Sequence, residues 1–161
     1  MLAASTPTVV IRQAEPDDLP ALMRMAEQFH AASPCAPYIP FCPASMAETF
    51  HRLAVNDESC LRVGEVNGEV LGMIAGVASP HYVNAAHTTT QELFWWVDPA
   101  ARHTRLGVRL LQAFEDWARE VGSRTLFMAS TATLTPDKLA RFYQRKGYGA
   151  VDVNYAKNLE N

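Results

Sequence analysis

From Glu92 to Gly122 the chain has an apolar segment, a short basic loop and a long amphipathic segment, a combination that could hold an anion. The loop reads Arg102-His103-Thr104-Arg105-Leu106-Gly107. Backbone N–H groups at a helix start attract phosphate, and a glycine lets the backbone approach the ligand closely. The guanidinium of Arg105 could add a two-pronged contact to phosphate. The segment therefore predicts a diphosphate site at the start of a helix.

A second pattern, KLARFYQRKGY from Lys138 to Tyr148, lies farther along the chain. Together the two segments resemble the GNAT superfamily of acyl-CoA-dependent N-acetyltransferases. In that family a pyrophosphate loop of pattern Gln/Arg-x-x-Gly-x-Gly/Ala follows the fourth strand, and a later helix ends in Tyr-x-x-x-Gly-Phe/Tyr. The matching residues are Arg102, Gly107, Tyr143, Gly147 and Tyr148. Two residues depart from the family pattern: Arg105 stands where the first glycine is expected, and Pro136 stands about where many members carry an asparagine.

The resemblance implies acetyl-CoA as cosubstrate, without a metal. It also implies that main-chain groups late in the fourth strand, Gln91 to Val97, bond the pantetheine arm of CoA. Strand alternation would put Glu92, Phe94 and Trp96 on one face, and the tryptophan side chains are expected to pack in the core. The cofactor-binding residues expected on these grounds are Trp95, Trp96, Val97, Arg102, His103, Thr104, Arg105, Leu106, Gly107 and Val108.

Acetyl transfer to an amine needs a neutral nucleophile, so an ammonium substrate must lose a proton. Glu92, in a strand expected to be buried, is the candidate base, directly or through a water, because burial raises a carboxyl pKa. His81 and His87 in the preceding segment are alternatives. Tyr143 matches the family's general acid, which protonates the departing CoA thiolate.

The acceptor is expected on the side of residues 29–52, where acidic residues flank several aromatic side chains. Phe29, Tyr38 and Phe41 are the candidate substrate-binding residues. Aromatic faces and carboxylates attract an ammonium group, which favours a cationic amine. Four prolines between Ser33 and Pro43 would keep this loop stiff.

Other site classes find little support in the sequence. His30, Cys35 and Cys42 follow no common zinc spacing. The chain has neither the Gly-x-Ser-x-Gly pattern of a nucleophilic serine nor the lysine-containing phosphate loop of nucleotide triphosphatases. A net charge of −3 does not favour nucleic acid, and no apolar run reaches the roughly 20 residues that a membrane helix needs.

The location is expected to be cytoplasmic. The first residues, MLAASTPTVVIRQ, lack the features of a secretory signal. Three cysteines cannot all pair within one chain, which favours a reducing compartment.

Length and 48% apolar content predict one domain over residues 1–161, with 1–7 flexible. The expected class is α/β (α+β), a mixed, mainly antiparallel GNAT-like sheet flanked by helices in the order βααβββαβαβ. The expected elements are a strand at 8–13, a helix opened by Pro16, a helix at 45–54, a hairpin of 60–65 and 69–78 about Asn67-Gly68, a polar loop at 79–89, the strand at 91–97, the helix ending at Gly122, a strand at 125–132, a helix from Thr135 to Gly147 and a strand at 150–159.

The sequence thus predicts an N-acetyltransferase that moves an acetyl group from acetyl-CoA to a primary amine by direct attack. Two alternatives remain open. The acceptor is a protein amine, either an N-terminus or a lysine, or the chain is a non-catalytic acyl-CoA-binding module of the same fold. The acceptor is accordingly a small-molecule or protein amine, and a homodimer is left open.

Overall fold

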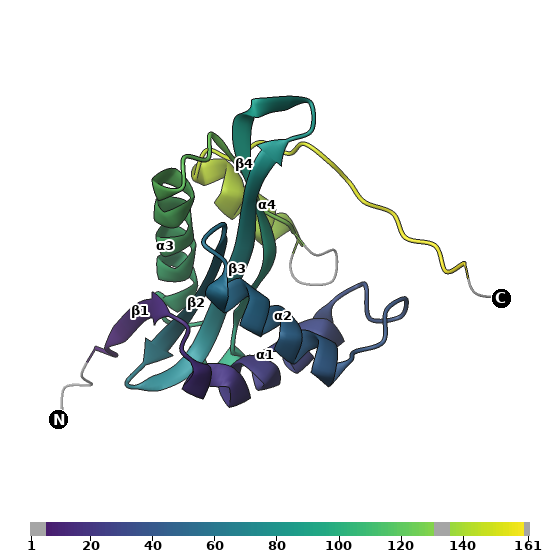
Figure 1. Ribbon diagram of the computed structural model, residues 1–161. Helices are drawn as coiled ribbons and strands as arrows, with labels where there is room; N and C mark the ends of the chain where they lie inside the picture. The colour runs from purple at the N-terminus through teal and green to yellow at the C-terminus, as the bar shows by residue number, and fades with distance from the viewer. Residues whose placement is uncertain (1–5, 131–135, 160–161) are drawn as a thin grey trace.

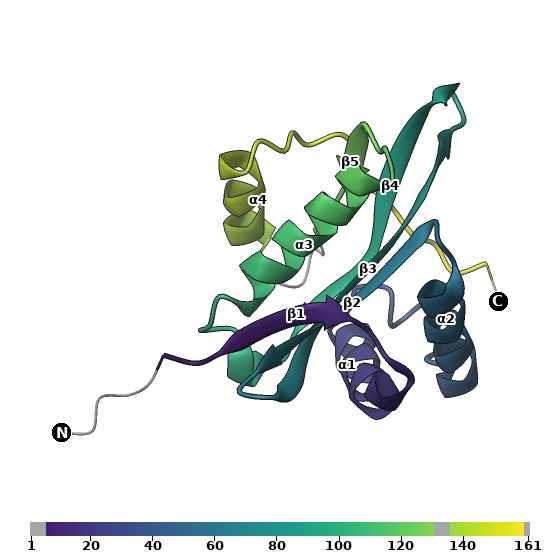
Figure 2. The ribbon, with the colours of Figure 1, turned by 60° about the vertical axis from the view of Figure 1, so that its left-hand side comes forward.

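A five-stranded sheet in the order β1-β2-β3-β4-β5 forms the centre of the computed structural model, which describes residues 6–130 and 136–159. Helices α1 and α2 cover one face of the sheet, and α3 and α4 cover the other (Figures 1 and 2). The predicted α/β class is therefore confirmed. The elements are β1 (Val9–Gln13), α1 (Leu19–Ala32), α2 (Pro43–Val55), β2 (Ser59–Val66), β3 (Glu69–His81), β4 (Asn84–Val97), α3 (Leu106–Glu120), β5 (Thr125–Phe127) and α4 (Pro136–Arg145), with 3-10 turns at Pro16–Asp18 and Pro99–Ala101.

Strands β1 to β4 pair antiparallel, and the turn between β2 and β3 is the predicted one. Asn67 and Gly68 both have positive φ, 53° and 85°. Two successive positive φ values match the right-handed twist of a tight hairpin, and Asn-Gly adopts them at little cost. This turn sets the register of the two strands that carry α3.

The segment 79–89, predicted to be a polar loop, is instead the outer part of a long β3–β4 hairpin. Ser79 pairs with Thr89 and Pro80 with Thr88, and the chain turns at Tyr82 and Val83. Part of the polarity that suggested a loop comes from Thr88 and Thr89, which are β-branched and favour strands. Strand β4 is consequently twice as long as the predicted 91–97.

Helix α3 lies in a groove made by three glycines of β2 and β3. A Cβ on Gly64 would come within 2.3 Å of Leu106, one on Gly72 within 2.8 Å of Leu110, and one on Gly76 within 2.4 Å of Phe114. Leu106, Leu110 and Phe114 are completely buried there. The absence of three side chains therefore lets α3 sit close to the sheet and fixes its first residue, next to the basic loop.

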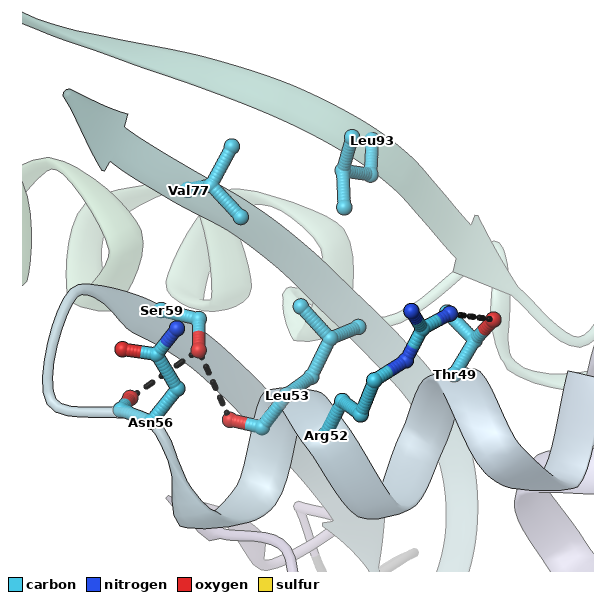
Figure 3. Close-up of a pocket in the computed structure, with 7 residues that line it drawn as sticks. All are labelled: Thr49, Arg52, Leu53, Asn56, Ser59, Val77 and Leu93. Atoms are coloured by element: carbon cyan, nitrogen blue, oxygen red, sulfur yellow. Dashed lines mark hydrogen bonds between the residues drawn. The ribbon is translucent and has the colours of Figure 1, made fainter.

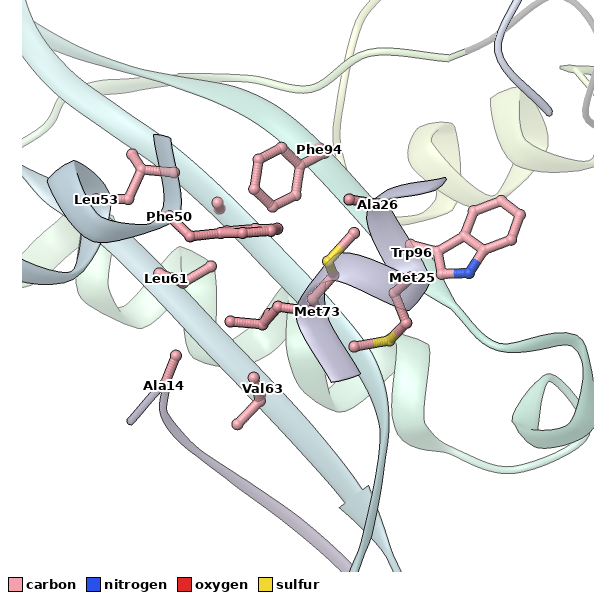
Figure 4. Close-up of a cluster of buried hydrophobic side chains, with 12 residues drawn as sticks. Ala14, Met25, Ala26, Phe50, Leu53, Leu61, Val63, Met73, Phe94 and Trp96 are labelled. Atoms are coloured by element: carbon pink, nitrogen blue, oxygen red, sulfur yellow. The ribbon is translucent and has the colours of Figure 1, made fainter. Parts of the chain in front are cut away.

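The opposite face of the sheet is filled by large side chains from α1, α2 and the strands (Figure 4). Phe50 of α2 packs edge-on against Phe94 of β4, with ring centroids 5.7 Å apart. The buried members of this cluster are Ala14, Leu22, Met25, Ala26, Phe50, Leu53, Leu61, Val63, Met73, Ala75, Phe94 and Trp96. This cluster gives α1 and α2 their fixed place beneath β4.

The predicted helix ends are confirmed. Gly122 and Gly147 have φ of 79° and 90°, and Ser123 and Tyr148 donate back to the carbonyls of Ala118 and Tyr143. A left-handed residue with such a bond is the usual glycine stop of a helix.

The last predicted strand, 150–159, does not form. Residues 149–159 have no strand pairing and run away from the sheet (Figure 1), with Val151, Val153 and Tyr155 at least 71% exposed. Their alternating apolar pattern is strand-like, but a strand needs a partner edge. Strand β5 is likewise shorter than the predicted 125–132. Thr135 and residues 1–5 of the predicted flexible start lie outside the described residues.

Candidate active site

Strands β4 and β5 run together only briefly and then separate. Their parallel pairing covers Thr89–Gln91 of β4 against Thr125–Phe127 of β5. From Glu92 to Val97, the edge of β4 that faces away from β3 therefore has no neighbouring strand in the described part of the chain. Apart from the Val97 carbonyl, which accepts from Arg102, its main-chain groups on that edge are available to a ligand, in the stretch where the sequence places the pantetheine contacts.

A β-bulge at Leu93 changes which face Glu92 occupies. Ala75 pairs with Phe94 and Gly76 pairs with Glu92, so Leu93 is an extra residue in β4. Phe94 packs in the α1/α2 cluster, and Leu93 borders α2. Glu92 instead bonds to Ala129, on the side of α4. The expected shared face of Glu92, Phe94 and Trp96 is therefore wrong, because an inserted residue breaks the two-residue alternation.

Glu92 is a buried carboxyl group, with 7% of its surface exposed. Its Oε2 accepts a hydrogen bond of 2.9 Å from the N–H of Ala129, just beyond β5. Burial raises the pKa of Glu92 from 4.5 to about 7, although the Ala129 bond lowers it slightly. Near neutral pH the group is therefore poised between its charged and neutral forms, as a general base requires.

Tyr143 of α4 lies next to this carboxyl group and bonds to the same residue. Its hydroxyl donates to the carbonyl of Ala129 at 3.1 Å. Burial, and then the negative charge of Glu92, raise the pKa of Tyr143 above its ordinary value, so the proton stays on the hydroxyl at neutral pH. The two groups predicted as base and acid are thus both attached to Ala129. No sequence signal marked Ala129, because it acts only through its main chain.

The end of α4 is held against α3 by Tyr148. Its hydroxyl donates to Glu115 of α3 at 2.8 Å, and its ring lies 5.3 Å from that of Tyr143. The last tyrosine of the family-like pattern therefore supports the position of the first.

The basic loop starts α3 without backbone strain. Arg105, which stands where the family has a glycine, has φ −84° and ψ 5°, a conformation open to any residue. The hydroxyl of Thr104 accepts from the N–H of Leu106, whose side chain is fully buried in the glycine groove. The N–H groups of Gly107 and Val108 have no acceptor among the described residues. Two donors at a helix start therefore remain for an anion.

Arg102 points away from these donors. Its Nε donates to the carbonyl of Val97 at 3.1 Å, and its guanidinium lies 4.7 Å from the ring centroid of Trp96. Arg102 is thus bonded to the last residue of β4. His103 and Arg105 are exposed beside the helix start, and the guanidinium of Arg105 keeps positive charge there.

The two neighbouring tryptophans of β4 differ in their indole N–H groups. Trp96 faces α1 and donates to Oε1 of Gln28 at 3.1 Å. Trp95 faces α3 and α4, where its ring lies 6.3 Å from both Phe142 and Tyr143. Its Nε1 is fully covered and has no acceptor in the described part of the chain.

The two histidines lie far from this site. His87 contacts the hydroxyl of Thr125 at 2.9 Å, and His81 stacks on Tyr82 at the hairpin tip. His87 is five residues before Glu92, which is roughly 16 Å along a strand. The structure therefore brings Glu92, and neither histidine, to Tyr143.

The three predicted acceptor residues do not form one cluster. Phe29 packs on Phe94 and Trp96, and Phe41 lies against the same core and the His30 ring. Tyr38 is 46% exposed on the loop between α1 and α2. Of the three, Tyr38 is the side chain most accessible to an acceptor.

An open pocket of about 260 Å³ lies between α2 and strands β3 and β4 (Figure 3). Its apolar wall includes Leu53 and the bulge residue Leu93, and Arg52 is its one charged lining residue. The lining residues are Thr49, Arg52, Leu53, Asn56, Ser59, Val77 and Leu93. The pocket therefore ends one residue from Glu92, on the face opposite Trp95.

Two absences in the described part of the chain concern the class of site. No three His, Cys, Asp or Glu side chains in residues 6–130 and 136–159 gather in a group that could hold a metal ion. Within the same ranges, no helix has the length and apolar character to cross a membrane.

The family model for the acetyltransferase (GNAT) family matches residues 23–148, which include β4, the basic loop, α3 and α4. The chain belongs to this family. GNAT acetyltransferases are acyl-CoA-dependent N-acetyltransferases. No curated protein matches the sequence.

Solved structures share the GNAT fold at low sequence identity. A transcriptional regulator from Bacillus halodurans C-125 has a TM-score of 0.74 and 22% identity, over 94% of this chain and 100% of the other. AAC(6')-Iy, solved with the bisubstrate analogue CoA-S-monomethyl-acetylneamine, has a TM-score of 0.73 and 15% identity over 94% and 99%. Glucosamine-6-phosphate N-acetyltransferase from Arabidopsis thaliana has a TM-score of 0.72 and 14% identity over 95% and 99%.

Proposed function

We propose that this protein is an N-acetyltransferase that transfers the acetyl group of acetyl-CoA directly to a primary amine. The observation that carries the proposal is the attachment of Glu92 and Tyr143 to the two main-chain groups of Ala129. This pair of proton-transfer groups lies where β4 and β5 separate.

Glu92 acts as the base. An ammonium acceptor gives a proton to the carboxylate, directly or through a water, and the freed nitrogen lone pair attacks the thioester carbon. The raised pKa of about 7 makes this proton transfer nearly balanced at neutral pH. The bond between the acyl carbon and sulfur then breaks, the electron pair stays on sulfur, and the second proton of the amine nitrogen passes to solvent as the amide forms.

Tyr143 supplies the proton for the departing thiolate. Its raised pKa keeps the hydroxyl protonated until the sulfur becomes negative, and the Ala129 carbonyl holds the hydroxyl in place. The products are the acetylated amine and the free thiol of CoA, and both side chains return to their starting protonation through solvent.

The residues on this side of β4 fit a CoA thioester. The free N–H groups of Gly107 and Val108, with Arg105 nearby, suit a diphosphate. The unpaired edge of β4 at Trp95 to Val97 suits the amides of the pantetheine arm, and the orphaned Nε1 of Trp95 is a further donor on the same side.

The amine is proposed to approach from the α1/α2 face. Support comes from the open pocket that ends at Leu93 and from the exposed Tyr38. AAC(6')-Iy was solved with CoA-S-monomethyl-acetylneamine, the Arabidopsis protein is a glucosamine-6-phosphate N-acetyltransferase, and a further structural neighbour is a ribosomal-protein-alanine N-acetyltransferase. The choice of a small-molecule amine over a protein amine therefore rests on the pocket.

The test is release of free CoA thiol from acetyl-CoA in the presence of a panel of amines. The proposal predicts release that depends on the amine, is lost in Glu92→Gln, and has a higher acceptor KM in Tyr38→Ala. Tyr38 is chosen over Phe41 because Phe41 packs on the core. Binding of CoA without thiol release for any small or peptide amine would identify a binding module instead.

A further inference from the structure

The indole of Trp95 lies between the two ends of the proposed CoA site. Its Cζ2 is 3.6 Å from the position of a Cβ on Gly107, and its ring centroid is 6.3 Å from that of Tyr143. Gly107 marks the diphosphate end of the site and Tyr143 the thioester end. The part of CoA that joins a diphosphate to a thioester is the pantetheine arm.

The Nε1–H of this indole is a buried donor without an acceptor in the described residues. Leaving such a group unpaired costs folding free energy, so nearly all buried donors in folded proteins find a partner. In the part of the chain that the structure describes, one other buried side-chain atom lacks a partner, Nε of Arg62, which lies on β2 beside Cys60 and away from β4. The Trp95 donor therefore calls for an explanation within the site.

Trp96 shows that the fold can satisfy an indole on β4 where the group has only a packing role. Its Nε1–H is bonded to Gln28, and its ring belongs to the α1/α2 cluster. On the other face, Phe142 and Tyr143 offer rings to Trp95 and no acceptor for its N–H.

We propose that the side chain of Trp95 is a CoA-binding group, and that its Nε1–H donates a hydrogen bond to an amide carbonyl of the pantetheine arm. This inference rests on the proposed function and adds a side-chain contact to the main-chain contacts of β4. Two amide carbonyls are the acceptors that the pantetheine arm offers between the diphosphate and the thioester. The indole thus recognises the middle of the ligand, while the loop recognises one end.

The test compares CoA affinity by calorimetry in the wild type, Trp95→Phe and Trp117→Phe. Phenylalanine keeps an aromatic ring at position 95 and removes the donor, which would leave a ligand carbonyl buried and unpaired. A dissociation constant about 5- to 100-fold higher is expected for Trp95→Phe. Trp117 of α3 is the control, because it is a buried indole in the same core cluster but outside the proposed site. Its variant should bind CoA as the wild type does.

A CoA affinity of Trp95→Phe within twofold of the wild type would overturn the inference and leave the proposed function standing. Absence of CoA binding in the wild type would overturn both. A packing role alone would lower the melting temperature without ligand; the inference predicts instead a smaller rise of melting temperature on adding CoA.

A measurement on the wild type covers the case in which Trp95→Phe does not fold. The indole N–H resonance of Trp95 should move downfield on CoA addition, as a new hydrogen bond requires. A resonance that stays fixed at saturating CoA would overturn the inference.

Discussion

The two faces of β4 differ in how the side chains of neighbouring residues are packed and hydrogen-bonded. On the α1/α2 face, Phe94 and Trp96 are packed by Phe29 and Phe50, and the indole of Trp96 is bonded to Gln28. Every ring there contacts another ring. The aromatic core of this face is therefore packed without CoA.

The α3/α4 face holds several polar groups that lack a hydrogen-bond partner or have a shifted pKa. Among the described residues, the indole N–H of Trp95 and the N–H groups of Gly107 and Val108 have no acceptor, and Glu92 is buried with a raised pKa. The buried indole N–H and the buried carboxyl cost folding free energy, and all of these groups suit a step of binding or catalysis. The proposed CoA-binding and proton-transfer groups of β4 thus lie on one face, and its packed aromatic core lies on the other.

The largest expected effect is that of Glu92→Gln on turnover. The amide keeps the shape and can still accept from Ala129, but it cannot take a proton. Loss of a positioned base costs about 10²- to 10⁴-fold in kcat. In the wild type, kcat/KM should rise with pH up to about 7 and then level off, and this limb should vanish in the variant. A pH profile unchanged by the substitution would remove Glu92 from the mechanism.

The same substitution should stabilise the protein in alkaline solution. Glu92 binds its proton more tightly in the folded state, with a pKa of about 7, than in the unfolded state near 4.5. Its contribution to stability therefore falls as pH rises from 4.5 through 7. Glu92→Gln should be more stable than the wild type by up to about 3 kcal/mol at pH 8, with little difference at pH 4.5. Denaturant unfolding at both pH values measures this.

On the opposite face, Phe50→Ala should damage folding and spare CoA binding. Phe50 is 2% exposed and contacts the Phe94 ring, so its removal leaves a cavity. We expect a loss of about 3–5 kcal/mol in the free energy of unfolding. Below its melting temperature, the variant should keep wild-type CoA affinity by calorimetry; a weaker affinity would mean that the two faces are coupled.

Tyr143→Phe should have the opposite effect to Phe50→Ala, because it should lower turnover and leave stability almost unchanged. The ring still packs on Trp95 and Tyr148, and only the bond to the Ala129 carbonyl is lost. Stability should change by about 1 kcal/mol, whereas kcat should fall by about 10²-fold under conditions where chemistry limits turnover. A wild-type kcat would assign the thiolate proton to another group.

Two glycine substitutions give the smallest and most closely matched test. A Cβ on Gly76 would lie 2.5 Å from the carbonyl oxygen of Gln91, so Gly76→Ala should cost about 1–3 kcal/mol of stability. A Cβ on Gly107 meets nothing closer than 3.4 Å, so Gly107→Ala should leave stability intact. It should weaken CoA binding about tenfold, or about 1.4 kcal/mol, because the backbone could no longer approach the diphosphate. Equal CoA affinity in Gly107→Ala and the wild type would place the diphosphate elsewhere.

Local patterns predicted much of the fold. Apolar periodicity gave α1, α2 and α3, Asn67-Gly68 gave the hairpin turn, and Gly122 and Gly147 gave the helix ends. These features depend on a few neighbouring residues, which a single sequence contains. The strand-like pattern at 150–159 misled because strand formation also depends on a partner edge, which no local pattern records.

Contacts between residues that are far apart in the sequence could not be predicted from it. The bulge at Leu93 moves Glu92 to the α4 side, and Ala129 contributes only main-chain atoms. Glu92 and Tyr143 could be named as candidates from their residue types and the family-like pattern. Their attachment to one residue could not be predicted, and neither could the difference between the indoles of Trp95 and Trp96.

The most direct test of this division is a titration of the isotopically labelled wild-type protein with CoA, observed through its amide and indole N–H resonances. The account predicts shifts at the amides of Gly107, Val108 and Ala129 and an unchanged indole resonance for Trp96, which stays bonded to Gln28. Shifts concentrated on α1 and α2, with the Gly107 and Val108 amides unmoved, would contradict the assignment of CoA binding to the α3/α4 face.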